Sequence, residues 1–205
     1  MWGNAKLDVI STDSSGTKIW NNAFEAVNNK PIGDVLQSAL VAGNNLFLSV
    51  NNSGKVLSID PVSLKQTKSN NTLKSPRNLL MVGDQLWVSD LYANKISVLD
   101  TSNLKTVKEI VMPGWTENMV RWGDYVAVSA YKGEVLLLNP STHAVERTLK
   151  VDSGALYLAV DAAMQLWVGC SLNGKSSLSA FALGQIDIVE VAHWKMTGDL
   201  GSIQL

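Results

Sequence analysis

One short hydrophobic segment occurs four times in this chain at a constant interval. The segments LFLSV, LWVSD, VAVSA and LWVGC begin at residues 46, 86, 126 and 166, so consecutive copies are 40 residues apart. Their β-branched and aromatic residues are those that strands prefer. An interval of roughly 20–50 residues is the signature of a repeat architecture. It therefore constrains the fold more than any single motif does.

Each repeat can be divided into four short strands, of which the recurrent segment is the second. Gly and Asn precede that segment, as at 43–45, and these residues adopt the positive φ angles that tight hairpins need. Asp60, Asp100 and Asn139 follow the third strand, where such side chains cap turns. Four antiparallel strands in about 40 residues predict an all-β fold, the β-propeller, with one repeat per blade.

The interval also predicts the limits of the blades within a single propeller unit. Full blades are expected at 38–77, 78–117, 118–155 and 156–198, after a leading strand and lead-in at 6–37, and before an inner strand of an incomplete blade at 199–205. A helical turn is expected at 24–27. Because a closed propeller leaves no blade edge unpaired, we expect a truncated propeller or one completed by another chain. A small closed propeller is the alternative.

Charge and composition exclude several classes of partner. The formal net charge is −1, whereas nucleic-acid binding requires a basic surface and polybasic membrane attachment requires clustered Lys and Arg. No run approaches the roughly 18 apolar residues of a membrane-spanning helix. The N-terminal MWGN lacks the features of a signal peptide. The single cysteine, Cys170, cannot form an intrachain disulfide.

The sequence offers no convincing catalytic or metal-binding motif. GCSLNGKS at 169–176 matches a P-loop formally, but 177–181 falls where every other repeat has its third strand, so a hairpin is predicted. His143, His193 and Cys170 lack metal-ligand spacing, and the two histidines support no Ser-His-Asp arrangement. We therefore expect no catalytic residue, metal or cofactor, and a protein that is not an enzyme.

The candidate ligand-binding residues lie on the loops of one propeller face. Loops after the second strand and before the first strand share that face, where ligands usually bind. Aromatic rings supply contact area there, while amides and Arg fix orientation. The candidates are Asn52, Arg77, Asp90, Tyr92, Asn94, Trp115, Glu117 and Tyr131. Blade packing is the alternative for Trp115, and core positions are expected for Trp87 and Trp167.

Several segments carry a family resemblance. Residues 88–100 resemble the consensus of YVTN-type propellers, and 22–28, 31–35, 75–77 and 114–119 are similar to the YncE-like surface propellers of gut Bacteroidetes. Members of that group usually follow a lipoprotein signal and close seven blades. Some relatives bind cobalamin at the outer surface and pass corrinoids to an outer-membrane transporter.

The resemblance implies a binding protein at the bacterial cell surface or in the periplasm, with the export signal absent from this chain. Its leading ligand is a corrinoid, captured for an outer-membrane transporter. The alternative is a structural propeller that docks a transporter or a glycan-utilisation partner. A propeller lyase or hydrolase is a third class, and it would need His and carboxylate side chains clustered at the channel mouth.

Overall fold

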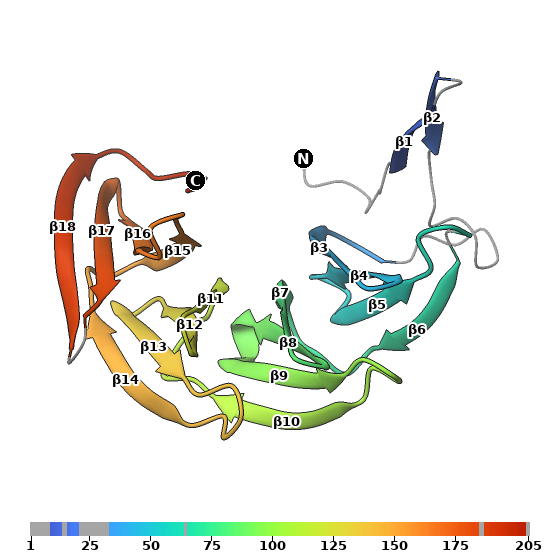
Figure 1. The fold of residues 1–205 in the computed structure, drawn as a ribbon, viewed down its shortest axis with the longest axis horizontal. Coiled ribbons are helices and arrows are strands. Elements are labelled where there is room, and N and C mark those ends of the chain that lie inside the picture. Colours follow the sequence, from blue (N-terminus) through green and yellow to red (C-terminus); the bar gives the residue numbers. More distant parts are fainter. Residues whose placement is uncertain (1–8, 14–15, 21–32, 64, 185–186, 204–205) are drawn as a thin grey trace. The chain divides into compact units, whose positions relative to one another are not determined.

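The computed structural model describes residues 9–13, 16–20, 33–63, 65–184 and 187–203. Sixteen of its strands form four sheets of four, in which strands that follow one another in the chain are neighbours and pair antiparallel (Figure 1). The first sheet consists of β3 (Leu36–Ala42), β4 (Asn45–Val50), β5 (Lys55–Ile59) and β6 (Gln66–Asn70), and the second of β7 (Pro76–Val82), β8 (Gln85–Asp90), β9 (Lys95–Asp100) and β10 (Thr106–Val111). The third sheet consists of β11 (Met119–Trp122), β12 (Tyr125–Ala130), β13 (Glu134–Leu138) and β14 (Val145–Lys150). The fourth consists of β15 (Ala155–Val160), β16 (Leu166–Leu172), β17 (Lys175–Leu183) and β18 (Ile188–Thr197). The predicted all-β propeller fold with four-stranded blades is thereby confirmed.

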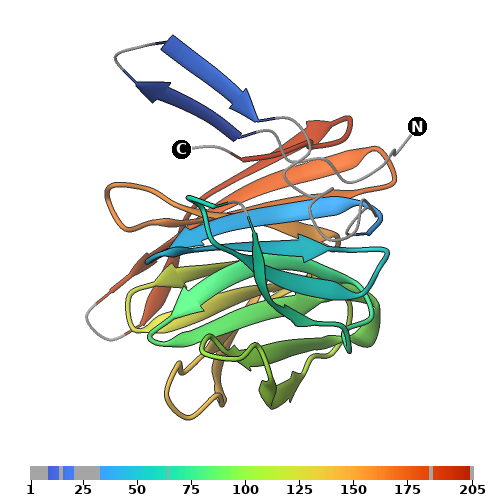
Figure 2. The same ribbon diagram turned by 90° about the vertical axis from the view of Figure 1, so that its right-hand side faces the viewer.

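A separate hairpin precedes these sheets. Strands β1 (Val9–Asp13) and β2 (Gly16–Trp20) pair antiparallel, with Val9 opposite Trp20 and Asp13 opposite Gly16 (Figure 2). The sequence predicts a leading strand within the segment 6–37, which corresponds to β1, but misses its partner β2. The helical turn expected at 24–27 lies outside the described residues.

The chain divides into two compact units. The first comprises residues 1–88 and 97–108, and the second comprises residues 89–96 and 109–205. In the first unit, Phe47 packs with residues of β7, β8 and β9, while Leu48 on the opposite face of β4 packs with Leu57 of β5. In the second unit, Trp122 packs with buried residues of β12, β13, β15 and β16.

The second strand of each blade is the most buried, which explains its continuous hydrophobic run. Neighbouring residues of a strand face opposite sides of the sheet, and in β4, β8 and β12 the five residues after the first are buried on both sides. Trp87 on β8 is 0% exposed, as predicted for a core residue.

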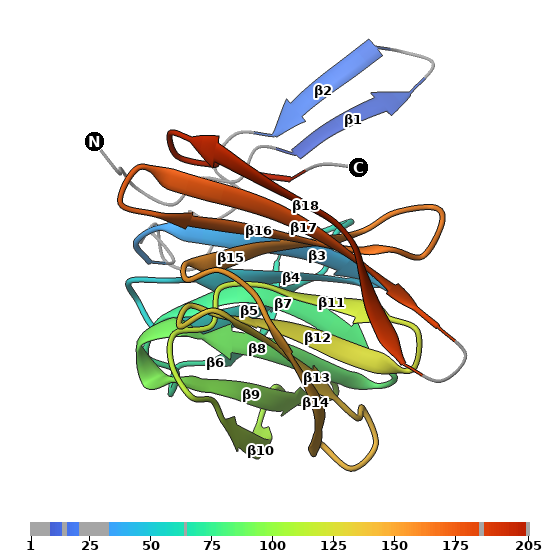
Figure 3. The ribbon, with the colours of Figure 1, turned by 90° about the vertical axis from the view of Figure 1, so that its left-hand side faces the viewer.

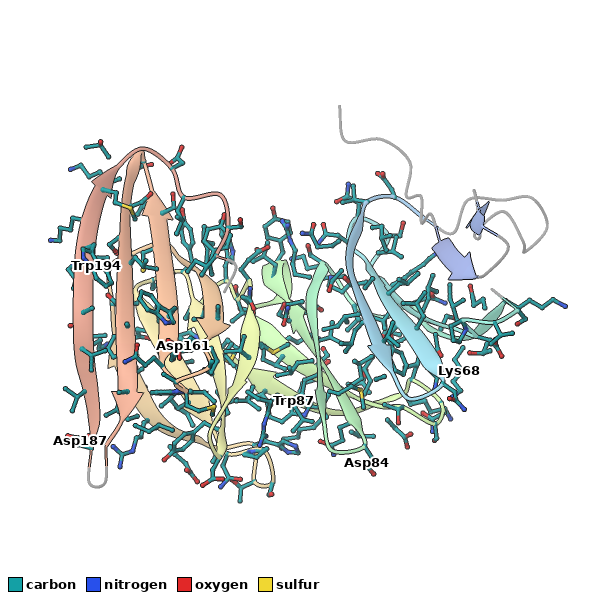
Figure 4. All side chains as sticks on the ribbon, turned by 45° about the horizontal axis from the view of Figure 1, so that its top comes forward. Lys68, Asp84, Trp87, Asp161, Asp187 and Trp194 are labelled. Carbon is teal, nitrogen blue, oxygen red and sulfur yellow. The ribbon has the colours of Figure 1, made fainter. Side chains whose placement is uncertain are left out.

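Trp167 on β16 differs from the prediction. Its ring is only partly buried, and it stacks on Trp194 of β18 with centroids 5.7 Å apart and planes 4° apart. Its indole N–H donates to Asp161 Oδ2 at 2.9 Å, and Figure 4 labels Trp194 and Asp161. The predicted core position is wrong, because Trp194, which covers this side of the sheet, is itself 48% exposed.

The repeated Asp and Asn residues are turn caps, as predicted. Asp60, Asp100 and Asn139 each accept hydrogen bonds from backbone N–H groups two or three residues further on, at 2.6–3.0 Å. Backbone hydrogen bonds from Ser63 and Val62 lower the pKa of Asp60. The hydrogen bonds from Ser102, the side-chain bond first, lower the pKa of Asp100.

When Asp60 and Asp100 are both replaced by asparagine, the protein should lose less thermal stability as the pH is lowered. Both folded-state pKa values lie below the ordinary value of 3.8, so the ionised carboxylates contribute stability above that value and lose it as pH falls through the folded-state values. Asparagine keeps the acceptor oxygen without titrating. Melting temperatures measured between about pH 6 and pH 2.5 should fall less steeply for the variant. Identical slopes would contradict the prediction.

The P-loop match is a β-hairpin. Asn173 and Gly174 join β16 to β17 with φ values of 54° and 71°. Positive φ at both central residues defines the type I′ turn of a two-residue hairpin. Strand β17 begins directly at Lys175, where a P-loop would begin its helix. The predicted hairpin is confirmed.

The inner strand expected at 199–205 does not form in the described residues up to Ile203. That segment is held by side chains instead of by strand pairing. Asp199 Oδ1 accepts from Ser171 Oγ at 3.2 Å, and Leu200 N–H donates to the same hydroxyl at 3.3 Å. A Cβ on Gly169 would lie 2.5 Å from Leu200 Cδ2, so the segment packs on the bare backbone of β16.

The described part of the chain contains no helix with the length and apolar character needed to cross a bilayer.

Candidate ligand-binding site

Backbone hydrogen bonds join the loops along one end of the second unit. Three of them join the loop after a second strand to a loop between two blades, and the fourth joins Ser171 of β16 to the loop before β15. The donor and acceptor pairs are Met112 N–H to Asn94 O at 2.9 Å, Tyr131 N–H to Trp115 O at 2.9 Å, Gly154 N–H to Tyr131 O at 2.8 Å, and Ser171 N–H to Gly154 O at 2.9 Å. We call the segments 91–94, 112–118, 131–133 and 151–154 the loop row. Their backbones are fixed by one another, so their side chains start from defined positions.

Three aromatic side chains of the loop row converge, and we call Tyr92, Trp115 and Tyr131 the aromatic cluster. The ring centroids of Tyr92 and Trp115 are 5.5 Å apart in an edge-to-face arrangement at 76°. Those of Trp115 and Tyr131 are 5.6 Å apart at 40°. Both separations lie in the range of favourable aromatic pairs. The sequence placed these residues on separate loops, and the structure brings them together.

The aromatic cluster remains open to solvent. Tyr92 is 48% exposed and Trp115 is 47% exposed, although each ring already contacts a neighbour. The alternative role of Trp115 as a buried filler between blades does not fit this exposure. An exposed group of rings with hydroxyl and indole N–H groups can stack on a flat ligand and also donate hydrogen bonds.

A short helical turn places the side chain of Tyr92 at the protein surface. It lies in η1 (Leu91–Ala93), a single turn of 3₁₀ helix in which Leu91 is buried. Asn94 ends the turn in the left-handed conformation, with φ 50°, and its N–H donates to Leu91 O. Asparagine tolerates this conformation better than most residues. Burial of Leu91 therefore directs the next residue outward.

The polar candidates of the second unit differ in their access to a ligand. Asn94 is exposed beside Tyr92, and Glu117 is partly buried. The backbone oxygen of Glu117 accepts a hydrogen bond from Ser89 Oγ at 3.2 Å. Asp90 is 0% exposed at the start of η1, which places its carboxylate inside the protein. Asn94 is thus the best-placed polar neighbour of the aromatic cluster.

The remaining two candidates, Arg77 and Asn52, belong to the first unit, where their side chains form hydrogen bonds with other residues of that unit. Arg77 Nη1 donates to Gln37 Oε1 at 3.0 Å, and Asn52 Nδ2 donates to Asp34 Oδ2 at 3.3 Å. Asn51, next to Asn52, is buried and donates through Nδ2 to Ser75 Oγ at 2.8 Å. Arg77 thus links β7 to β3, and Asn52 links the loop after β4 to the segment before β3.

Two residues near the candidates were missing from the predicted set. Lys132 is exposed, and its aliphatic stem would lie 3.5 Å from a Cβ built on Gly114, next to Trp115. Tyr157 on β15 is partly buried; burial, followed by the charges of Glu117 and Asp199, raises the pKa of its hydroxyl. A repeat pattern cannot identify such neighbours, because they come from different blades.

A Ser-His-Asp grouping occurs on the last blade, contrary to the sequence-based expectation. Ser179 Oγ lies 2.8 Å from His193 Nδ1, and His193 Nε2 lies 3.5 Å from Asp152 Oδ2. Ser179 and His193 are direct cross-strand partners in the β17–β18 register, which the sequence alone did not fix. Ser179 is 2% exposed, so its hydroxyl is not presented to a substrate.

The four-stranded blades, which carry an exposed aromatic cluster on their loops, define a protein of the β-propeller class. A family model described as Domain of unknown function (DUF5074) matches residues 4–190, and the chain belongs to that family. No curated protein matches the sequence significantly.

Solved structures with similar folds include several enzymes. Hydrazine synthase from Kuenenia stuttgartiensis matches with a TM-score of 0.67 at 16% identity, covering 76% of this chain and 47% of the other. Dihydro-heme d1 dehydrogenase NirN in complex with DHE matches at 0.67 and 17%, covering 89% and 43%. A putative 6-phosphogluconolactonase from Bacteroides uniformis matches at 0.68 and 10%, covering 95% and 66%. The chain thus spans between 43% and 66% of their lengths.

These structures correct one prediction. The absence of a catalytic motif predicted that the protein is not an enzyme, and this prediction is contradicted, because the solved structures with a similar fold include a synthase and a dehydrogenase. At 10–17% identity the likeness establishes the fold alone.

Proposed function

We propose that the aromatic cluster binds a large, flat, amphipathic ligand. The observation that carries the proposal is the convergence of Tyr92, Trp115 and Tyr131 with centroid separations of 5.5 and 5.6 Å while two of the rings stay half exposed. Ring faces supply contact area to such a ligand, and Asn94 and the tyrosine hydroxyls supply hydrogen bonds. The rigid backbone of the loop row reduces the entropy lost on binding.

The ligand we favour is a corrinoid, captured at the bacterial cell surface and passed to an outer-membrane transporter. Support comes from the resemblance of residues 75–77 and 114–119 to YncE-like surface propellers, since 114–119 include Trp115. A dehydrogenase with a similar fold is named for dihydro-heme d1. A corrin ring also combines a flat apolar body with polar amide groups at its edge, which suits an aromatic cluster with polar neighbours.

The test is a calorimetric titration with cyanocobalamin of the natural chain, Trp115→Ala and a matched control, Trp194→Ala. Trp194 has the same side chain at 48% exposure, against 47% for Trp115, but lies on β18 outside the aromatic cluster. Trp115→Ala should raise Kd about tenfold or more, and Trp194→Ala should leave it within about twofold. Folding is checked by circular dichroism. Absence of saturable heat from the folded natural chain rejects the corrinoid.

One observation favours the alternative of a docking protein. Strand β18 is the outermost strand of its sheet (Figure 3), and Val189, Trp194 and Met196 on it are 41–55% exposed. Exposed apolar residues on an edge strand can pair with or pack against another chain. Under this alternative, Trp194→Ala weakens capture of a transporter or glycan-utilisation partner and Trp115→Ala does not, which is the reverse of the corrinoid result.

A further inference from the structure

A cavity of about 940 Å³ lies in the second unit, between the blade β15–β18 and the loop segment before β15. Its lining includes Asp152 from the loop, Cys170 and Leu172 from β16, Lys175 and Ser177 from β17, and Lys195 from β18. None of these residues belongs to the aromatic cluster. The volume falls in the range of about 300–1,000 Å³ typical of small-molecule sites.

Strand register explains why these side chains meet. Cys170 is the cross-strand partner of Ser177, and Ser177 is in turn the partner of Lys195. Leu172 is likewise opposite Lys175. Directly opposed residues of antiparallel strands point to the same face of the sheet, so the cavity has an apolar patch from β16 and a basic border from β17 and β18.

The base of the cavity is apolar and uncharged. Cys170 is 2% exposed, and burial raises the pKa of its thiol to about 11, although the nearby Ser177 hydroxyl opposes the shift. The thiol therefore stays neutral near pH 7 and behaves as a small hydrophobic group. Together with Leu172 it offers a surface for a hydrocarbon or aromatic body.

The polar groups of the cavity keep hydrogen-bonding capacity that a ligand can use. Ser177 is 2% exposed, and its hydroxyl has no oxygen or nitrogen partner among the described residues; its polar neighbour is the Cys170 thiol. Because a thiol is only a weak hydrogen-bond partner, the hydroxyl can still donate to a ligand. Lys175 and Lys195 are exposed at the border, where neither forms an ion pair with another described side chain. The one acidic lining residue, Asp152, has His193 Nε2 at 3.5 Å.

We propose that this cavity is a second binding site, and that its ligand is an amphipathic carboxylate. The apolar body of the ligand lies against Cys170 and Leu172. Its carboxylate accepts hydrogen bonds from the ammonium groups of Lys175 and Lys195, and the Ser177 hydroxyl donates to it. Charge-assisted hydrogen bonds of this kind are the strong ones. The site goes beyond the corrinoid proposal and does not depend on it.

The test uses decanoate as the probe, titrated by calorimetry below the concentration at which it self-associates. The variants are the double substitution Lys175→Met with Lys195→Met, and Lys105→Met as a matched control on an exposed lysine outside the cavity. Methionine keeps the length and apolar character of the lysine stem but removes the charge. The double variant should raise Kd for decanoate about tenfold or more, and the control should leave it unchanged.

Two further variants test whether decanoate binds in the cavity itself. Leu172→Trp, which fills the cavity without changing charge, should abolish decanoate binding while the melting temperature stays close to that of the natural chain. Trp115→Ala should leave decanoate binding unchanged. No saturable binding by the folded natural chain, an unchanged Kd in the double lysine variant, or loss of binding in Trp115→Ala would each overturn the proposal. None of these results bears on cyanocobalamin binding at the aromatic cluster.

Discussion

Replacing Trp122 by alanine should lower the free energy of unfolding by about 3–5 kcal/mol. Trp122 is 0% exposed within the core of the second unit, and its indole N–H donates to Met164 O at 2.8 Å. Truncation removes the buried ring, leaves a cavity, and deprives a carbonyl oxygen of its donor.

Urea unfolding followed by tryptophan fluorescence and circular dichroism measures this effect. Trp122→Phe, which retains most of the buried ring but loses the hydrogen bond, should cost less than alanine, with about 1 kcal/mol arising from the bond. Trp115→Ala is the exposed control, and its cost should stay under about 1 kcal/mol. A Trp122→Ala midpoint equal to that of Trp115→Ala would show that the core does not depend on the ring.

The second large effect is expected at Gly54, which lies between β4 and β5 with φ +60°. A Cβ built there would lie 2.3 Å from the backbone oxygen of Leu73, closer than real Cβ atoms come. Gly43 has nearly the same φ, +56°, but its Cβ would meet nothing within 4 Å. Gly43→Ala therefore measures the cost of the left-handed backbone, and Gly54→Ala adds a collision with main chain.

We expect Gly43→Ala to cost about 1 kcal/mol and Gly54→Ala about 3 kcal/mol or more. Because a main-chain oxygen cannot move aside as a flexible side chain can, relief requires a shift of the loop that contains Leu73. Thermal unfolding of the two variants side by side gives the difference directly. Equal melting temperatures would mean that the loop containing Leu73 can shift without loss of stability, contrary to the prediction.

The fold was predictable because the strongest signals are local and repeated. The apolar second strand recurs every 40 residues, and the Asp or Asn after the third strand recurs with it. Both signals arise within one blade, because each blade contains a buried strand and a turn capped by a side chain. The hairpin at Asn173–Gly174 follows from the same local turn chemistry.

What the sequence could not show depends on contacts between repeats. Tyr92, Trp115 and Tyr131 were individually predicted as loop residues, but their convergence depends on the hydrogen bonds within the loop row. Asp90 looked like a ligand contact in sequence and is buried instead. The cavity beside Lys175 and Lys195 was missed because strand register, which sets the side-chain face, is not encoded by residue spacing alone.

The loop row also bears on how such a domain can acquire new ligands. Its backbone amides and carbonyls bond one another between Asn94 and Met112, Trp115 and Tyr131, and Tyr131 and Gly154. These bonds do not depend on which side chains the residues carry. Substitution at 92 or 115 can therefore alter specificity while the supporting loops keep their shape. A scaffold of this kind lets recognition diversify through exposed side chains at little cost to folding.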